Sequence, residues 1–321
     1  MSAWSDWQPL PLAGPVPSES VLAEILDGGQ AFRWNGAAHP HPLGEITPPA
    51  NRDPAVGGAT SSRGLGPIWF GQWADCAAEV RLESAHLAWR ARPASAPRVA
   101  AAIGPYFAAD RDFGALADAL PWRSDAHLAA CLQRFPGLRL LRQPFGETLL
   151  GFLCSATKQI VQIKQMLALL AERHGAGHQP PCHSLPTWET LATIPERTLR
   201  DCLLGFRARF IHQTAVFLAA HPSWLEETEL MPYAAAKERL CSLPGVGEKI
   251  ADCVLLFGAG RLEAFPVDVW ILRTMTERYG LHGWKPAQVA HFGRTHFGPL
   301  AGLAQQYLFA FERTGGGARR H

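Results

Sequence analysis

The sequence has no closely spaced pair of cysteines and no apolar run long enough to cross a membrane. Its seven cysteines are odd in number, are scattered and form no CxxC pair: Cys76, Cys131, Cys154, Cys182, Cys202, Cys241 and Cys253. Neither a disulfide framework nor a zinc site is therefore indicated. No segment reaches the roughly 18 apolar residues that span a bilayer, and the first residues contain no basic stretch followed by an apolar run. We expect a protein with reduced thiols that is neither secreted nor inserted in a membrane.

The sequence also lacks an excess of charge of one sign. It contains 30 Lys and Arg against 28 Asp and Glu, a formal net charge of +2, and it is 18% charged and 47% hydrophobic. These values are ordinary for a globular protein with a substantial core. Because a local basic face is enough to bind phosphates, a nearly neutral chain neither indicates nor excludes a nucleic-acid partner.

The hydrophobic pattern changes from strand-like to helical along the chain. Apolar and polar residues alternate at 30–34, 68–73 and 78–82, which predicts half-buried antiparallel strands. From about residue 97 the spacing is helical, and it predicts helices at 97–107, 113–120, 124–135, 148–155, 159–175, 187–192, 196–203, 206–220, 231–240, 269–279, 286–297 and 300–312.

We therefore expect an α+β fold in which an antiparallel β-sheet domain precedes helical domains. The sheet domain is predicted at 1–122 and contains a flexible insert near 35–66, which is rich in Pro, Gly, Ser and Ala. The helical domains are predicted at 123–312 and contain a helix-hairpin-helix at about 232–258. A disordered basic tail is expected at 313–321.

A tight turn, Leu243-Pro244-Gly245-Val246-Gly247, separates two helical segments. Its glycines permit a positive φ and a close approach to the backbone. Backbone amides at such a turn, at the start of a helix, can bind a DNA phosphate. Because no cysteine follows Cys253, the four-cysteine iron–sulfur loop that follows such a hairpin in some enzymes cannot form here.

Two residues near the turn have the chemistry of a catalytic pair. Lys249 follows the hairpin, and a buried lysine whose pKa is lowered can act as a nucleophile; the alternative is that it only contacts phosphate or water. Asp268 precedes a predicted helix and could cap it. The same carboxylate could stabilise positive charge that develops on a deoxyribose C1′. The residues alone leave both alternatives open.

The turn, the lysine and the aspartate together resemble the helix-hairpin-helix DNA glycosylase superfamily, and more closely the 8-oxoguanine DNA glycosylase family. The similarity covers most of residues 20–312 in order. It rests on LCSLPGVGEKIADC at 240–253, FPVDV at 265–269, GQAFRW at 29–34, LLRQ at 140–143, FLCS at 152–155, LGFRARF at 204–210 and YLF at 307–309.

The resemblance implies a bifunctional glycosylase and abasic-site lyase that acts on oxidised purine, first of all 8-oxoguanine, in duplex DNA. Lys249 would attack C1′ of a flipped nucleotide and form a Schiff base that undergoes β-elimination, and Asp268 would stabilise the positive charge. The base pocket would include the backbone carbonyl of Gly29 and the side chains of Cys253, Gln305 and Phe309.

The resemblance also implies a set of DNA-binding residues. They are the hairpin residues Gly245, Val246 and Gly247, a turn with Thr157 and Lys158, a wedge at Phe206 and its neighbour Arg207, and Trp270. The chain departs from the family at three places. Residues 155–159 replace an asparagine-rich turn, Trp270 replaces a histidine, and Gln162 stands at the place of an arginine that reads the opposite cytosine.

The implied enzyme needs no cofactor and no catalytic metal, although hairpin carbonyls could hold a monovalent cation. Its partner would be double-stranded DNA with a damaged base, and we expect a monomer. It would act in the cytoplasm at the nucleoid in a bacterium and in the nucleus in a eukaryote. Two alternatives remain: a glycosylase for alkylated or other damaged bases, and a noncatalytic DNA-binding module that keeps only the hairpin.

Overall fold

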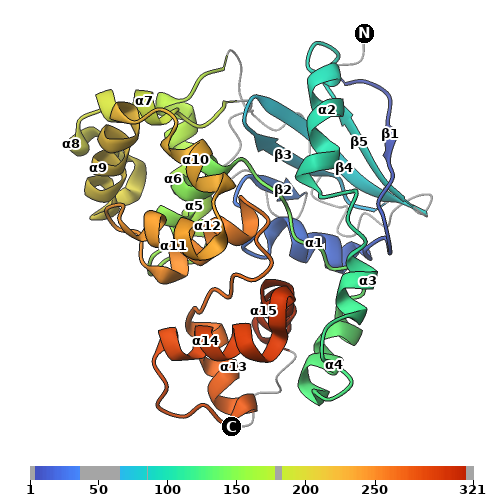
Figure 1. The fold of residues 1–321 in the computed structure, drawn as a ribbon. Helices are drawn as coiled ribbons and strands as arrows, with labels where there is room; N and C mark the ends of the chain where they lie inside the picture. The colour runs from blue at the N-terminus through green and yellow to red at the C-terminus, as the bar shows by residue number, and fades with distance from the viewer. Residues whose placement is uncertain (1–3, 37–65, 85, 178–182, 316–321) are drawn as a thin grey trace, which may run out of the picture.

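The computed structural model describes residues 4–36, 66–84, 86–177 and 183–315. Within them the N-terminal part contains a five-stranded antiparallel sheet of order β1-β5-β4-β3-β2. Its strands are β1 (Gln8–Leu10), β2 (Trp34–Gly36), β3 (Trp69–Trp73), β4 (Cys76–Glu83) and β5 (His86–Ala91). The predicted α+β fold, with an antiparallel sheet followed by helices, is confirmed (Figure 1).

A close contact between two strands fixes the centre of the sheet. Trp34 pairs with Gly71 across β2 and β3. A Cβ at Gly71 would lie 2.3 Å from the Trp34 ring, so only glycine leaves room for the indole. Trp34 is fully buried, and its Nε1 donates a hydrogen bond of 2.9 Å to the Tyr106 hydroxyl of α2 (Ala96–Tyr106). This bond joins the sheet to the helix that packs on β4 and β5.

The remaining helices mostly lie where the spacing predicts them. Their bounds are α1 (Glu19–Asp27), α3 (Phe113–Asp118), α4 (Ala126–Arg134), α5 (Phe145–Leu153), α6 (Ile160–His174), α7 (Trp188–Thr193), α8 (Glu196–Leu199), α9 (Arg207–Ala220), α10 (Trp224–Leu230), α11 (Tyr233–Cys241), α12 (Glu248–Phe257), α13 (Val269–Tyr279), α14 (Pro286–Phe297) and α15 (Ala301–Arg313).

Several local predictions are wrong or incomplete. The strand predicted at 30–34 exists only at Trp34, because Gln30 is fully buried and instead bonds to the backbone at Arg139 and Leu141. The helices α1 and α10 and the strands β1 and β5 were not predicted. The helix predicted at 196–203 ends as a regular helix at Leu199, and a π-helical turn with a kink follows at Arg200–Leu204.

The predicted insert falls largely outside the described residues. Residues 37–65 are not among them, but Asn35 belongs to β2 and the Gly66 amide donates to the Leu82 carbonyl. Residues 316–321 of the predicted tail also lie outside the described part, whereas Arg313 ends α15. The domain division at 122–123 stays a prediction.

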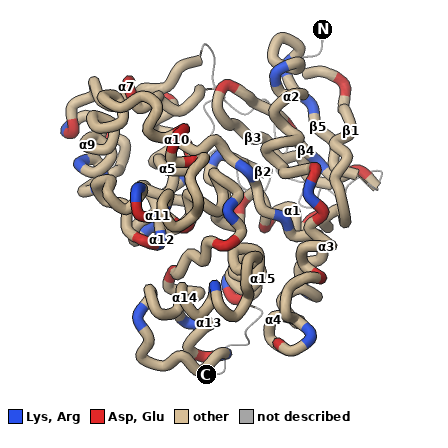
Figure 2. The backbone as a smooth tube through the Cα atoms, in the orientation of Figure 1, with Lys and Arg blue, Asp and Glu red and all other residues tan. Residues whose placement is uncertain are grey.

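The helices form two groups (Figure 1). One group surrounds α12, whose residues from Ile250 to Phe257 are all buried and which packs against α5 and α11. The other consists of α13, α14 and α15, with α4 packed against α15. Figure 2 shows Lys and Arg interspersed with Asp and Glu over the sheet and both helical groups, as expected from the small net charge.

Candidate active site

The positive φ predicted for the hairpin glycines between α11 and α12 is found at Gly245 but not at Gly247. Gly245 has φ 77°, and a Cβ there would lie 2.8 Å from Cβ of Phe210 in α9. Gly247 precedes α12 with extended backbone, and a Cβ there would meet open space. The Val246 amide already donates to the Leu243 carbonyl at 3.1 Å. The predicted phosphate contact of the hairpin stays a prediction, for which the amides of Gly245, Gly247 and the first turn of α12 are suited.

Lys249 lies in the first turn of α12, half-buried, and its amine is directed to the end of α5. Its Nζ is 3.4 Å from Oγ of Ser155 and 5.2 Å from the ring centroid of Phe152. The aromatic ring and the buried helix around it limit the water that reaches the amine. A hydroxyl within hydrogen-bonding distance fixes its direction.

Asp268 caps α13, as the sequence predicts, because its Oδ1 accepts a hydrogen bond of 2.9 Å from the Ile271 amide. We expected the cap to favour the charged carboxylate. The net effect is the opposite: burial raises the pKa of Asp268, although the Ile271 amide and the nearby Lys249 act to lower it. Desolvation outweighs the helix N-terminus here.

One pocket brings together all six residues that were predicted to be catalytic or to line the base pocket. Lys249 and Cys253 come from α12, Gln305 and Phe309 from α15, and Asp268 and Gly29 from the segments that precede α13 and follow α1. Residues from both ends of the chain therefore meet at the end of the hairpin helix. Burial raises the pKa of the Cys253 thiol to about 12, so this cysteine is a neutral thiol at physiological pH.

The pocket has an unused hydrogen-bonding group. Gln305 is only 5% exposed, and its Oε1 has no hydrogen-bond partner among the described residues. Buried polar atoms almost always have a partner, so an unpaired one in a pocket is well suited to a ligand. Gly29 has φ 107°, and a Cβ there would lie 3.7 Å from the Phe309 ring and 3.3 Å from Ile160. A side chain at Gly29 would narrow the pocket beside Phe309.

The sequence analysis missed further residues of this pocket. They are Phe152, Phe257, Pro266 and Gln306, all of which line it. Phe152 and Pro266 lie within the quoted FLCS and FPVDV motifs, which could have pointed to them. Phe257 lies four residues after Cys253 and Gln306 three residues before Phe309, but helical spacing alone does not show which neighbouring face borders the pocket.

The predicted DNA-contacting turn lies next to the pocket. Thr157 has φ 55° and is exposed, as is Lys158. Arg207 is only 3% exposed; it donates to the Ala156 carbonyl and, at 3.1 Å, to Oγ1 of Thr157. In the free protein it therefore holds this turn, and its contact with DNA stays a prediction. Phe206 is 52% exposed, with the Arg207 guanidinium 4.4 Å from its ring centroid.

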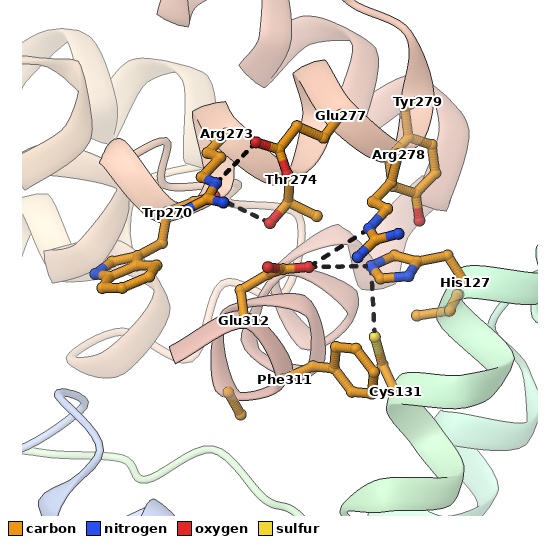
Figure 3. A network of polar contacts seen from close by, with 12 residues as sticks. His127, Cys131, Trp270, Arg273, Thr274, Glu277, Arg278, Tyr279, Phe311 and Glu312 are labelled. Atoms are coloured by element: carbon orange, nitrogen blue, oxygen red, sulfur yellow. Dashed lines mark hydrogen bonds and ion pairs between the residues drawn. The ribbon is translucent and has the colours of Figure 1, made fainter. Parts of the chain in front are cut away.

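Trp270 lies in the first turn of α13 and is 38% exposed. The far end of the same helix is anchored by polar contacts with α15 and α4, as Figure 3 shows. Glu312 of α15 lies between Arg278 of α13, at 3.8 Å, and His127 of α4, at 3.9 Å. Asp268 caps α13 and α15 carries Gln305, so these contacts link two helices that border the pocket.

The described residues contain no group of three or more His, Cys, Asp or Glu that could hold a metal ion. Of the helices in the described ranges, none is long and apolar enough to cross a membrane. The predicted cation at the hairpin stays a prediction.

Comparisons with known proteins agree with this architecture. Residues 150–295 match the family model "HhH-GPD superfamily base excision DNA repair protein". A probable N-glycosylase/DNA lyase of Methanothermobacter thermautotrophicus is 30% identical over 216 residues, which are 60% of this chain and 69% of that protein. An N-glycosylase/DNA lyase of Arabidopsis thaliana is 32% identical over 59% of this chain, and the chain spans 56% of the plant protein.

A solved structure extends the similarity to nearly the whole fold. The 8-oxoguanine glycosylase/lyase of Clostridium acetobutylicum, in complex with duplex DNA containing cytosine opposite 8-oxoguanine, matches with a TM-score of 0.76 and 26% identity. The match covers 92% of each chain.

The chain belongs to the HhH-GPD superfamily of base excision DNA repair proteins. Within it, the relatives place the chain in the N-glycosylase/DNA lyase family, and the resemblance to 8-oxoguanine DNA glycosylases is confirmed. The expectation of a base-excision enzyme is confirmed with it, which removes the alternative of a noncatalytic DNA-binding module.

Proposed function

We propose that this enzyme excises oxidised purine, first of all 8-oxoguanine, from duplex DNA and then cleaves the strand at the abasic site. The observation that carries the proposal is the pocket itself. Lys249 and Asp268 line it together with the unpaired Oε1 of Gln305, so a nucleophile, a carboxylate and an acceptor for base recognition share one space. The aromatic rings of Phe152 and Phe309 line the same pocket and are suited to stack on a flipped base.

In the proposed reaction the neutral amine of Lys249 attacks C1′. The Nζ–C1′ bond forms as the glycosidic bond breaks, and the base leaves with a proton. The carboxylate of Asp268 stabilises the positive charge on the sugar. Lys249 then loses its remaining proton as the sugar ring opens to the Schiff base. Removal of a C2′ proton expels the 3′ phosphate by β-elimination, which nicks the strand.

Asp268 is suited to carry protons in these steps. Burial raises the pKa of Asp268 above the usual value of an aspartate, which makes the carboxylate a better proton acceptor. Its hydrogen bond with the Ile271 amide keeps one oxygen fixed at the head of α13.

The partner in this proposal is damaged double-stranded DNA, bound by the hairpin, by the turn at Thr157 and Lys158, and by Phe206, Arg207 and Trp270. The enzyme would act as a monomer without a required cofactor, with a monovalent cation held by hairpin carbonyls. It would act where DNA is, at the nucleoid of a bacterium or in the nucleus of a eukaryote.

A second candidate is excision of alkylated bases with the same catalytic pair. The observation that favours it is the aromatic lining, because Phe152, Phe257 and Phe309 could stack on a base that carries positive charge. A related fold is found in the 3-methyladenine DNA-glycosylase of Archaeoglobus fulgidus, at 18% identity and a TM-score of 0.66, which shows the fold alone.

A panel of lesion duplexes tests the proposal. Duplexes that contain 8-oxoguanine, 3-methyladenine analogues or undamaged guanine are incubated with excess enzyme, and the released base and the nicked strand are quantified separately. We expect release of 8-oxoguanine with a nicked strand. Release of the alkylpurine without release of 8-oxoguanine would decide for the second candidate.

A further inference from the structure

Leu203 has a backbone and a side chain that are both unusual for leucine. It lies in the kinked turn Arg200–Leu204 with φ 63° and ψ 13°, in the left-handed region that leucine rarely adopts. Its neighbours Cys202 and Leu204 are fully buried, whereas Leu203 is 58% exposed. The kink therefore projects an apolar side chain into solvent at the expense of backbone strain. Strain of this kind is concentrated at functional sites.

The same edge of the molecule carries the predicted DNA contacts. Phe206 follows Leu203 by less than one helical turn and is 52% exposed. Arg207 connects the kink to the neighbouring turn, because it donates to the Leu204 carbonyl at 3.3 Å and to Oγ1 of Thr157 at 3.1 Å. Leu203, Phe206 and Thr157 thus belong to one surface that a single buried guanidinium holds together.

This surface lies between the pocket and the hairpin. The turn that contains Thr157 begins at Ser155, whose Oγ is 3.4 Å from Nζ of Lys249. On the other side, the rings of Phe206 and Phe210 lie edge to face with their centroids 6.2 Å apart, and Gly245 of the hairpin packs on Phe210. A duplex bound at the hairpin with a nucleotide in the pocket would therefore pass close to Phe206, three residues after Leu203.

The charged residues near Leu203, Phe206 and Thr157 are also suited to a DNA partner. Lys158 is exposed beside Thr157, and Arg209 is exposed one turn into α9. These cations can contact phosphates on both sides of the apolar pair. Apolar side chains flanked by cations are the composition with which proteins open base steps in DNA.

We propose that Leu203 is a second apolar wedge, which enters the duplex on the strand opposite the lesion and supports the base left unpaired there. The inference rests on the proposed function and names the part of the enzyme that holds the opposite strand. Thr157 is too short to fill the space that a flipped nucleotide leaves, and Leu203 supplies the missing volume.

A consequence concerns the choice of opposite base. A leucine side chain has no donor or acceptor, so it contacts any base through its apolar surface and cannot read a hydrogen-bonding edge. Gln162, at the place where the family carries an arginine, bonds instead to the Gln159 amide at 3.1 Å. The enzyme therefore excises its lesion at similar rates opposite all four bases.

The test replaces Leu203 with residues that tolerate the positive φ at this position. Leu203→Gly and Leu203→Asn both accept a positive φ, so their Tm is expected at or above that of the wild type. Leu203→Met keeps an apolar side chain of similar reach. Leu230→Asn removes another exposed leucine, 82% exposed at the end of α10, and is the matched control. Affinity is measured for a duplex with a tetrahydrofuran abasic analogue and for the same undamaged duplex.

We expect Leu203→Gly and Leu203→Asn to lose about 10-fold in affinity for the tetrahydrofuran duplex, because the apolar contact of the leucine side chain with the unpaired base is lost. Leu203→Met and Leu230→Asn should bind like the wild type. If Leu203→Gly and Leu203→Asn bind the tetrahydrofuran duplex as tightly as the wild type, the wedge is overturned. Single-turnover excision opposite each base should differ by less than about 10-fold, and a cytosine preference well above this would overturn the opposite-base consequence.

Different results would refute the proposed substrate and the proposed Leu203 wedge. The tetrahydrofuran assay involves no base, so it tests the wedge whichever lesion the enzyme removes. A wild type that releases no 8-oxoguanine refutes the proposed substrate and leaves the binding comparison intact.

Discussion

Replacing Gly245 by alanine tests whether the hairpin is held in one conformation by its glycine. The residue has φ 77°, where an L side chain costs about 1–2 kcal/mol. The new Cβ would lie 2.7 Å from Cγ and 2.8 Å from Cβ of Phe210, and forcing atoms into a packed site costs about 1–3 kcal/mol more. We therefore expect Gly245→Ala to lower the free energy of unfolding by about 2–5 kcal/mol.

Gly247→Ala is the matched control, because Gly247 has extended backbone and open space where its Cβ would go. Urea unfolding should leave it within about 0.5 kcal/mol of the wild type. The double variant Gly245→Ala with Phe210→Ala should relieve the contact with the Phe210 ring, but neither the 2.8 Å contact with Cβ at position 210 nor the unfavourable φ. Equal effects of Gly245→Ala and Gly247→Ala would refute this account of the hairpin.

Two further predictions concern the pocket. Asp268→Asn should keep the cap of α13 and abolish excision. Because burial raises the folded-state pKa of Asp268, its ionised form disfavours folding, and stability is lost as pH rises through that pKa. The variant should thus be at least as stable as the wild type at pH 7. The difference in stability should vanish below the unfolded carboxyl pKa of about 3.9. Urea unfolding at pH 7 and below that pKa measures the difference, and a variant less stable than the wild type at pH 7 would contradict this expectation. Gln305→Leu removes a buried Oε1 without a partner in the described part of the chain, so its Tm should equal or exceed that of the wild type, while affinity for lesion duplex falls about 10-fold. A clear drop in its Tm would show that Gln305 is structural.

The sequence predicted the catalytic end of the protein better than the sheet end. The hairpin, the cap at Asp268 and the helices around them follow from glycine, proline and helical spacing, all of which act locally. The α1 helix was missed although Ser18 caps it and its apolar residues Val21, Leu22, Ile25 and Leu26 have helical spacing. The local sequence therefore contains the signal for α1.

Other features could not be predicted because they depend on contacts between distant segments. Gln30 looks like a strand residue, but it is buried against the backbone at residues 139–143. The raised pKa of Asp268 reflects desolvation by surrounding helices, which a local cap argument omits. The left-handed Leu203 has no local signal at all, since a leucine at that backbone angle is held there by its buried neighbours.

The central claim is that Lys249 is the nucleophile, and borohydride trapping tests it most directly. Wild type, Lys249→Ala and the exposed-lysine control Lys285→Ala are each incubated with an abasic-site duplex and sodium borohydride, which reduces a Schiff base to a stable amine. The account predicts a covalent protein–DNA band for the wild type and for Lys285→Ala, and none for Lys249→Ala. Trapping of Lys249→Ala at the wild-type level would contradict it.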